Sequence, residues 1–191
     1  EMYDMQQVGA IAFTDYAKGV TNSNLLKLAL QYAQNIDAII IDFPLDRNIA
    51  LDGQMHEGKY STQLGLKGIP AMAEILQIKR DLTLLTYTGG RIHFPNITCK
   101  RSALLIKNAK KKGLSVTCSV AAHHLVLTDA ELSDFNTFYK VTPPLREKSD
   151  VKALVNAVLD GTIDMITSDH NPIDIENKKV EFYNAENGSI G

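Results

Sequence analysis

The stretch from Asp164 to Pro172 carries the residues of this sequence that are best placed to do chemistry. It reads Asp-Met-Ile-Thr-Ser-Asp-His-Asn-Pro, so a short apolar strand ends in Ser-Asp-His and a turn-forming Asn-Pro pair follows. In an α/β barrel, a carboxylate at the carboxyl end of a strand stands at the mouth where the chemistry is done. Asp169 is therefore the first candidate for a catalytic or metal-binding group. The alternative is that it caps the following turn or bonds nearby backbone amides.

Histidines supply the other candidate groups. His123 and His124 leave a strand side by side, and adjacent side chains of a strand point in opposite directions. We therefore expect one of them to pack and hydrogen-bond in the core and the other to face the mouth, rather than both binding one metal ion. His56 and Glu57 lie in a loop next to a glycine, where we expect contacts that order the loop rather than catalysis.

Composition narrows the class of protein. With 191 residues and 45% hydrophobic content, the chain can bury one domain-sized core. A net charge of −2 offers no electrostatic surface for nucleic acid or an anionic membrane. Cys99 and Cys118 have neither metal-ligand spacing nor a disulfide framework, which fits a reducing cytoplasm. No apolar run reaches the roughly 18 residues of a membrane span, and no signal peptide is visible. The start at Glu1 suggests a piece excised from a longer protein.

Apolar runs and capping residues divide the chain into alternating strands and helices. Five strands are expected, at residues 8–14, 37–43, 91–94, 114–118 and 163–167. Helices are expected at residues 22–34, 70–84, 100–112 and 149–161, the last capped by Ser149 or Asp150, with a further short helix opened by a capping box at residues 128–131.

Strands that alternate with helices imply right-handed βαβ units and a parallel sheet, so the fold class is α/β. A closed barrel of this type has eight strands, whereas this chain supplies five. We expect one incomplete domain over residues 1–191. Its two open sheet edges would be covered either by the rest of a longer protein or by another copy of the chain.

Four motifs follow one another along the chain. They are Met55-His56-Glu57-Gly58 with Leu64-Gly65-Leu66-Lys67-Gly68-Ile69-Pro70, then His123-His124-Leu125, Pro143-Pro144-Leu145-Arg146 and Ser168-Asp169-His170. In this order and spacing they resemble the dihydroorotase and allantoinase branch of the amidohydrolase superfamily, cyclic amidases that use metal-activated water. The resemblance implies a partial TIM-type (β/α) barrel that contains about the fourth to the eighth strand. The family's His-x-His metal pair would then lie upstream of Glu1.

The resemblance also implies a metal site, of which this chain retains two carboxylates. Asp15 matches the family's bridging carboxylate, and Asp169 matches the residue that binds metal and takes the proton from the attacking water. Phe43 and Asn96 stand where the family has strand-end histidine ligands. A phenyl ring has no lone pair, and an amide oxygen is a poor zinc ligand beside a neutral imidazole. We therefore expect no tightly bound zinc, the metal of the family.

Further site positions of the family are changed as well. Thr142 stands where relatives have a substrate-contacting asparagine before Pro-Pro-Leu-Arg, and Ile173 replaces the second histidine of Asp-His-Ala-Pro-His. After the seventh strand, many relatives show a glutamate where this chain has Ser119. These substitutions fall on site positions while the motifs of the scaffold persist.

Two functions of different classes follow from the resemblance. One is a metal-dependent cyclic amidohydrolase, a dihydroorotase of pyrimidine biosynthesis that hydrolyses a ring C–N amide bond with unusual ligands. The other is a catalytically impaired homologue that acts as a scaffold or partner. By analogy with silent members of the family, its partner would be aspartate carbamoyltransferase. The clustered substitutions favour the second function, and we also expect a homo-oligomer.

Overall fold

The structure is a computed structural model that describes residues 2–190. Its centre is a five-stranded sheet in the order β1-β2-β5-β6-β7, in which every neighbouring pair is parallel. The strands are β1 (Ala12–Thr14), β2 (Ile39–Ile41), β5 (Ile92–Phe94), β6 (Val116–Ala121) and β7 (Met165–Thr167). All five expected strands are confirmed. The first is shorter than expected because α1 (Met2–Gln7) and a turn precede it.

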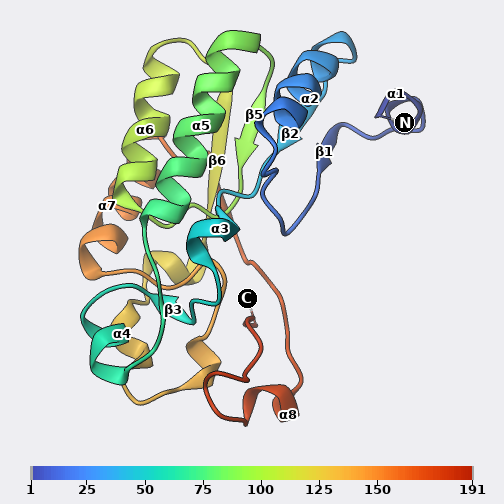
Figure 1. Ribbon diagram of the computed structural model, residues 1–191. Coiled ribbons are helices and arrows are strands. Elements are labelled where there is room, and N and C mark those ends of the chain that lie inside the picture. The colour runs from blue at the N-terminus through green and yellow to red at the C-terminus, as the bar shows by residue number, and fades with distance from the viewer. Residues whose placement is uncertain (1, 191) are drawn as a thin grey trace.

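Four longer helices cover one face of this sheet, and short elements gather where the strands end (Figure 1). The longer helices are α2 (Ser23–Asn35), α5 (Met72–Thr88), α6 (Lys100–Lys111) and α7 (Lys148–Leu159). The short elements are α3 (Arg47–Ala50), β3 (Met55–His56), α4 (Lys59–Leu64), β4 (Gly68–Ile69), η1 (Ala122–Leu125), η2 (Asp129–Leu132), η3 (Thr137–Tyr139) and α8 (Ile175–Lys178). Strands β3 and β4 form a separate parallel pair.

The main core lies between the sheet and these helices, and alternation along the strands explains it. Ile92 and Phe94 point to the helices and are almost fully buried, as are Val116 and Cys118 on the next strand. Between these two residues, Thr117 points to the opposite face and is exposed. This arrangement is an open, partial (β/α) barrel.

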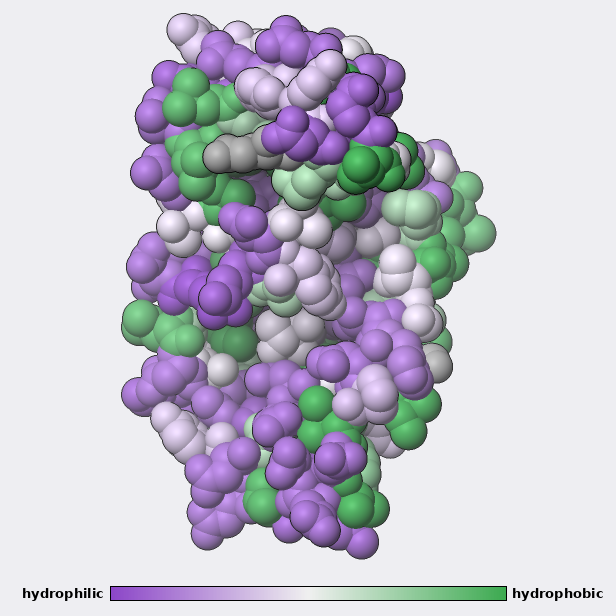
Figure 2. Space-filling view, turned by 90° about the vertical axis from the view of Figure 1, so that its right-hand side faces the viewer, coloured by the Kyte–Doolittle hydropathy of each residue, from purple (hydrophilic) through white to green (hydrophobic). Residues whose placement is uncertain are grey.

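Both edges of the partial barrel leave hydrophobic side chains uncovered. At the β7 edge, Met165 is 50% exposed and Ile166 is 54% exposed. The opposite edge lies on the face that Figure 2 shows, where hydrophobic patches stand among hydrophilic residues. Exposed hydrophobic residues of α1, of α2 and of the turn before β1 include Tyr3, Met5, Val8, Ile11, Leu25 and Leu28. The edges of the sheet are therefore apolar surfaces that other polypeptide can cover.

Helix ends follow local chemistry in some places and tertiary contacts in others. Asn22 and Ser23 are both candidates for the cap of α2. Asn22 is the cap, since its side-chain oxygen accepts hydrogen bonds from the backbone N–H groups of residues 24 and 25. The cap expected at Ser149 or Asp150 is wrong, because α7 begins at Lys148. Asp150 instead accepts a hydrogen bond of 2.8 Å from the backbone N–H of Lys100 at the start of α6.

The capping box expected at residues 128–131 is also wrong. Thr128 makes no side-chain cap hydrogen bond, and the following segment is a single 3-10 turn, η2. No helix within residues 2–190 is both long and apolar enough to cross a membrane.

Candidate functional site

The candidate site lies where the parallel strands end. Asp15, Phe43, Asn96 and Asp169 come shortly after β1, β2, β5 and β7, respectively. Because the strands are parallel, their carboxyl ends meet at one edge of the sheet, as in the active sites of α/β barrels. The topology therefore places all four residues at the same end of the sheet.

Asn96 and Asp169 are in direct contact. The amide Nδ2 of Asn96 donates a hydrogen bond of 2.8 Å to Oδ1 of Asp169, and its Oδ1 accepts one of 2.8 Å from the hydroxyl of Thr167. The backbone N–H of Asn96 donates to the hydroxyl of Ser119. Asn96 is only 5% exposed, so its amide is held in one orientation and directed at the carboxylate. Asp169 is therefore more than a cap of the following turn.

Tyr16 and His123 surround the same carboxylate. Partial burial, followed by the charge of Asp169, raises the pKa of the Tyr16 phenol. Burial lowers the pKa of the His123 imidazole, and the charge of Asp169 opposes this effect. The phenol is therefore un-ionised and the imidazole uncharged at neutral pH. The phenol of Tyr16 and the imidazole of His123 can therefore donate and accept hydrogen bonds beside the negative charge of Asp169.

Phe43 joins this group through Tyr16. The two rings meet edge to face with their centroids 6.3 Å apart. Phe43 is 3% exposed and packs with the apolar residues Leu45, Ala50, Ile69 and Ala73. At the end of β2 the structure thus has a buried hydrophobic cluster where the resemblance would place an imidazole.

Asp15 and Thr142 are less closely tied to this group. Asp15 is exposed beside Tyr16, and it shares a shallow surface depression with Thr14 and Lys18. Thr142 is half-buried in the segment before α7. Within residues 2–190, no hydrogen bond or ion pair links either side chain to Asn96 or Asp169. Their roles in a site remain predictions.

The two adjacent histidines divide as expected. His124 is 2% exposed, and its Nε2 lies 3.0 Å from the carbonyl oxygen of Pro143. Burial is the main cause that lowers its pKa to about 3, so it is a neutral core histidine. His123 lies at the edge of the Asp169 group and lines a neighbouring pocket.

Two of the other histidines, His56 and His93, lie away from the candidate site, whereas His170 directly follows Asp169. His93 lies 2.8 Å from the hydroxyl of Thr117, through its Nδ1. His56 is 6% exposed, and its Nδ1 accepts a hydrogen bond of 3.0 Å from Nη1 of Arg146. Burial and then the Arg146 charge lower the pKa of His56, so it is a neutral residue that orders its loop.

Arg146 is the centre of a buried network that sequence reasoning missed. The side chain is 1% exposed, and its Nε donates a hydrogen bond of 3.0 Å to the hydroxyl of Thr98. Its Nη2 lies 3.9 Å from the carboxylate of Glu74, which is fully buried and accepts the backbone N–H of Thr98. The network ties the β3–β4 pair, α5 and the start of α6 together. Only the position of Arg146 in the Pro-Pro-Leu-Arg motif hinted at this role.

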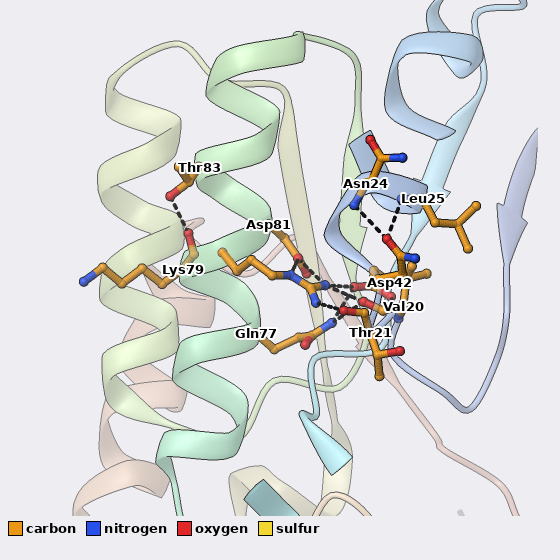
Figure 3. Close-up of polar contacts among 11 residues, drawn as sticks. Val20, Thr21, Asn24, Leu25, Asp42, Gln77, Lys79, Asp81 and Thr83 are labelled. Carbon is orange, nitrogen blue, oxygen red and sulfur yellow. Dashed lines mark hydrogen bonds and ion pairs between the residues drawn. The ribbon is translucent and has the colours of Figure 1, made fainter. Parts of the chain in front are cut away.

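A second buried cluster holds the connection between β1 and α2 (Figure 3). Asp42 follows β2 and is fully buried; its Oδ1 accepts the backbone N–H of Val20 at 2.7 Å, and its Oδ2 accepts Gln77 Nε2 at 2.9 Å. Arg80 Nη2 lies 2.7 Å from Asp81 and 3.6 Å from Asp42. Burial, then the neighbouring Asp42, raises the pKa of Asp81 to about 9. Asp81 is therefore protonated at neutral pH.

Comparisons with known proteins agree with this fold and with the motifs. Residues 1–102 match the family described as dihydro-orotase-like. Over 191 residues the chain is 44% identical to a dihydroorotase of Acetivibrio thermocellus and 43% identical to one of Syntrophus aciditrophicus. In both cases all of this chain is aligned with 45% of the relative. The chain therefore spans less than half the length of these curated relatives.

Solved structures of amidohydrolases share the fold. An L-hydantoinase (dihydropyrimidinase) from Arthrobacter aurescens superimposes with a TM-score of 0.82 and 21% identity, covering 100% of this chain and 45% of that one. A dihydroorotase of Saccharomyces cerevisiae in complex with 5-fluoroorotic acid gives a TM-score of 0.73 and 19% identity, covering 99% of this chain and 53% of that one. From the matched residues, the motifs and the partial barrel, we conclude that the chain belongs to the dihydroorotase-like family of amidohydrolases.

Proposed function

We propose that this chain is part of a catalytically impaired dihydroorotase homologue of pyrimidine biosynthesis, which serves as a scaffold or partner rather than as a hydrolase. The observation that supports this most is the hydrogen bond between the Asn96 amide and the Asp169 carboxylate. At the position of a family metal ligand, a neutral amide N–H faces the carboxylate where a cation would be needed for hydrolysis.

The residues of this chain do not fit a zinc ion at this site. Zinc prefers imidazole, thiolate and carboxylate ligands, usually four in all. Phe43 offers no lone pair, and the amide oxygen of Asn96 already accepts the hydroxyl of Thr167. Within residues 2–190, no three His, Cys, Asp or Glu side chains come together as a possible metal site. Two carboxylates, Asp15 and Asp169, could at most hold Mg²⁺ or Ca²⁺ weakly.

The physical consequence for hydrolysis concerns the attacking water. Without a cation, a water molecule beside Asp169 keeps a pKa near that of bulk water, about 15.7, and is a poor nucleophile at neutral pH. Asp169 could still accept a proton, but the hydroxide that it would have to generate is not stabilised. The Asn96 amide also occupies one of the carboxylate oxygens.

An active dihydroorotase is the second candidate function. It is favoured by the retained carboxylates, Asp15 and Asp169, and by 44% identity to a curated dihydroorotase along the whole chain. In this case, ligands from the part of the barrel outside this chain would have to compensate for Phe43 and Asn96.

A scaffold function requires a partner and an assembly. By family analogy we propose aspartate carbamoyltransferase as the partner and a homo-oligomer as the state of the protein, located in the cytoplasm. We propose neither nucleic acid nor a membrane as a partner, because the net charge of −2 offers no basic surface to bind them. Mixing the purified proteins and measuring their mass by light scattering tests the partner directly.

The decisive experiment restores the rest of the barrel and compares two proteins. The full-length protein and its Phe43→His, Asn96→His variant are dialysed with zinc, analysed for bound metal and assayed for hydrolysis of dihydroorotate. A control carries two exposed substitutions, Phe135→His and Asn184→His. We expect zinc binding and turnover only after restoration of the two strand-end histidines. Turnover by the unsubstituted protein would refute impairment.

A further inference from the structure

The C-terminal segment, which we define as residues 171–190, is a loop whose two ends lie side by side. The backbone N–H of Asn171 donates a hydrogen bond of 2.9 Å to the carbonyl oxygen of Ser189, which closes the neck of the loop. Within the loop, the backbone N–H of Glu186 donates to the carbonyl oxygen of Asn177 at 3.3 Å. A loop that is closed at its neck and bonded within itself has the build of an Ω-loop, and it can open as one body.

This segment covers one side of the candidate site. It leaves the end of β7 just after Asp169, passes through α8 and turns back toward the strand ends (Figure 1). Its residues Ile173 and Ile190 line a cavity of about 290 Å³ together with His123 and Val141 of the barrel. Movement of the segment away from the barrel would therefore open this cavity, and the His123 side of the site, to solvent.

One buried ammonium group holds the segment against the rest of the chain. Lys140 is 3% exposed, and its Nζ donates to three carbonyl oxygens of the segment at 2.7, 3.2 and 2.7 Å, those of Phe182, Tyr183 and Ala185. Outside the segment, Gln54 Oε1 accepts at 2.7 Å, so three N–H donors face four oxygen atoms. Within residues 2–190, no other group donates a hydrogen bond to the three carbonyl oxygens.

A second lysine fastens the segment in the opposite direction. Lys178 lies on α8 and is 3% exposed, and its Nζ donates to the carbonyl oxygens of Thr137 and Lys140 at 3.2 and 3.1 Å. The backbone N–H of Gly188 donates to the same Lys140 carbonyl at 3.0 Å. Burial, followed by the Lys178 charge, lowers the pKa of Lys140 to about 8, so the ammonium is still its main form at neutral pH. The attachments of the segment thus gather at residues 137–140.

We propose that the C-terminal segment is a lid over the Asp169 site and that the Lys140 ammonium is the latch that keeps it closed. In the closed state this ammonium is the hydrogen-bond donor for three buried carbonyl oxygens. Without it, these oxygens lack a donor as long as the lid is closed, whereas water can bind them once the lid is open. Removal of the latch therefore favours the open lid. The proposal is independent of whether the protein hydrolyses dihydroorotate.

A cysteine beneath the lid reports its opening. Val141→Cys places a thiol in the covered cavity, and its reaction with an excess of a thiol reagent is followed over time at pH 7. The unsubstituted chain, in which Cys99 and Cys118 are both buried, is the blank. Adding Lys140→Ala should speed the reaction of the new thiol by at least about tenfold, because the lid loses hydrogen bonds to a charged group.

Two controls separate opening of the lid from other effects. Lys179→Ala removes an exposed lysine from the same segment and should leave the reaction of the Val141→Cys thiol unchanged. Ala157→Cys places a thiol in the main core on α7, where the residue is 6% exposed. This thiol should react slowly with or without Lys140→Ala, since its exposure requires unfolding of the barrel.

Chemical rescue tests whether the latch acts as a cation. Propylammonium supplies the alkyl chain and the ammonium group that Lys140→Ala removes. It should slow the reaction of the Val141→Cys thiol toward the rate seen with Lys140 in place, whereas 1-propanol at the same concentration should not. An unchanged thiol rate in the Lys140→Ala variant, or equal rescue by the alcohol, would overturn the proposal.

Hydrogen exchange of the unsubstituted chain provides a test that holds even if Lys140→Ala does not fold. The backbone N–H groups of Asn171, Lys178 and Gly188 are hydrogen-bonded in the closed lid. As urea is raised, they should exchange through one shared opening of lower free energy than the opening that exposes the amide of Ile92 in the sheet. Exchange of the lid amides only together with the sheet would overturn the proposal.

Discussion

Replacing Asp81 with asparagine should remove a loss of stability that builds up as the pH rises from the acid range to about 9. The folded chain raises the pKa of Asp81 from 3.8 to about 9, mainly through burial and then through Asp42. Between these values the folded state binds one proton more than the unfolded state, so the free energy of unfolding falls by about 1.4 kcal/mol per pH unit. This stabilisation is fully present below the ordinary pKa and is lost as the pH rises through about 9.

Asparagine imitates the protonated acid without titrating. Its Oδ1 can still accept from Arg80, whose Nε lies 2.8 Å from Asp81 Oδ1, and its amide N–H can face Asp42. Asp81 Oδ2 is buried without a hydrogen-bond partner within residues 2–190, so an amide NH₂ in its place breaks no existing hydrogen bond. The substitution therefore changes the pH dependence with little change in packing.

Urea unfolding followed by circular dichroism at pH 6, 7 and 8 measures this effect. From the lowest to the highest of these values, the stability advantage of the Asp81→Asn variant over the unsubstituted chain should grow by about 3 kcal/mol. Asp174→Asn, a change at an exposed residue, is the control and should run parallel to the unsubstituted chain. Parallel curves for Asp81→Asn as well would show that Asp81 is ionised in the folded state, and would refute the reasoning.

Three further substitutions test the buried contacts. Arg146→Met should lower the free energy of unfolding by about 3–5 kcal/mol, because it leaves the carboxylate of Glu74 buried without a counter-charge. The double variant with Glu74→Gln should recover part of this loss in urea unfolding. A double variant whose loss equals the sum of the losses of the two single variants would contradict the network. Asn96→Ala should cost about 1.5–3 kcal/mol by the same measurement, since it removes a hydrogen bond to a charged group, and an unchanged stability would mean that the bond to Asp169 contributes nothing. Gly188→Ala should lower the melting temperature, because its Cβ would lie 2.4 Å from the carbonyl oxygen of Asn171. An unchanged melting temperature would show that the segment tolerates a side chain at this position.

The sequence alone determined the order of the five sheet strands and the four longer helices, and it pointed to the family. The apolar run at residues 37–43 predicts a strand buried on both faces, and all five strands of the sheet lie within or overlap the expected ranges. Burial on both faces is wrong for this strand, because only Ile40 is buried, while Ile39 and Ile41 are partly exposed on the other face. Asn22 predicts the start of α2, and Gly89 and Gly90 predict the turn after α5, where both adopt positive φ. These features are local, because backbone propensity and burial leave a periodic pattern in neighbouring residues.

Only the tertiary structure decided which polar groups meet. Asn96 and Asp169 are 73 residues apart, and Arg146 and His56 are 90 residues apart. Asp150 suggested a local cap but binds the N–H of Lys100 on another helix. Periodicity reports that a side chain is buried, whereas its partner depends on how separate strand ends and loops pack together. A buried polar group must find a partner wherever that packing provides one, and local sequence carries no record of the choice.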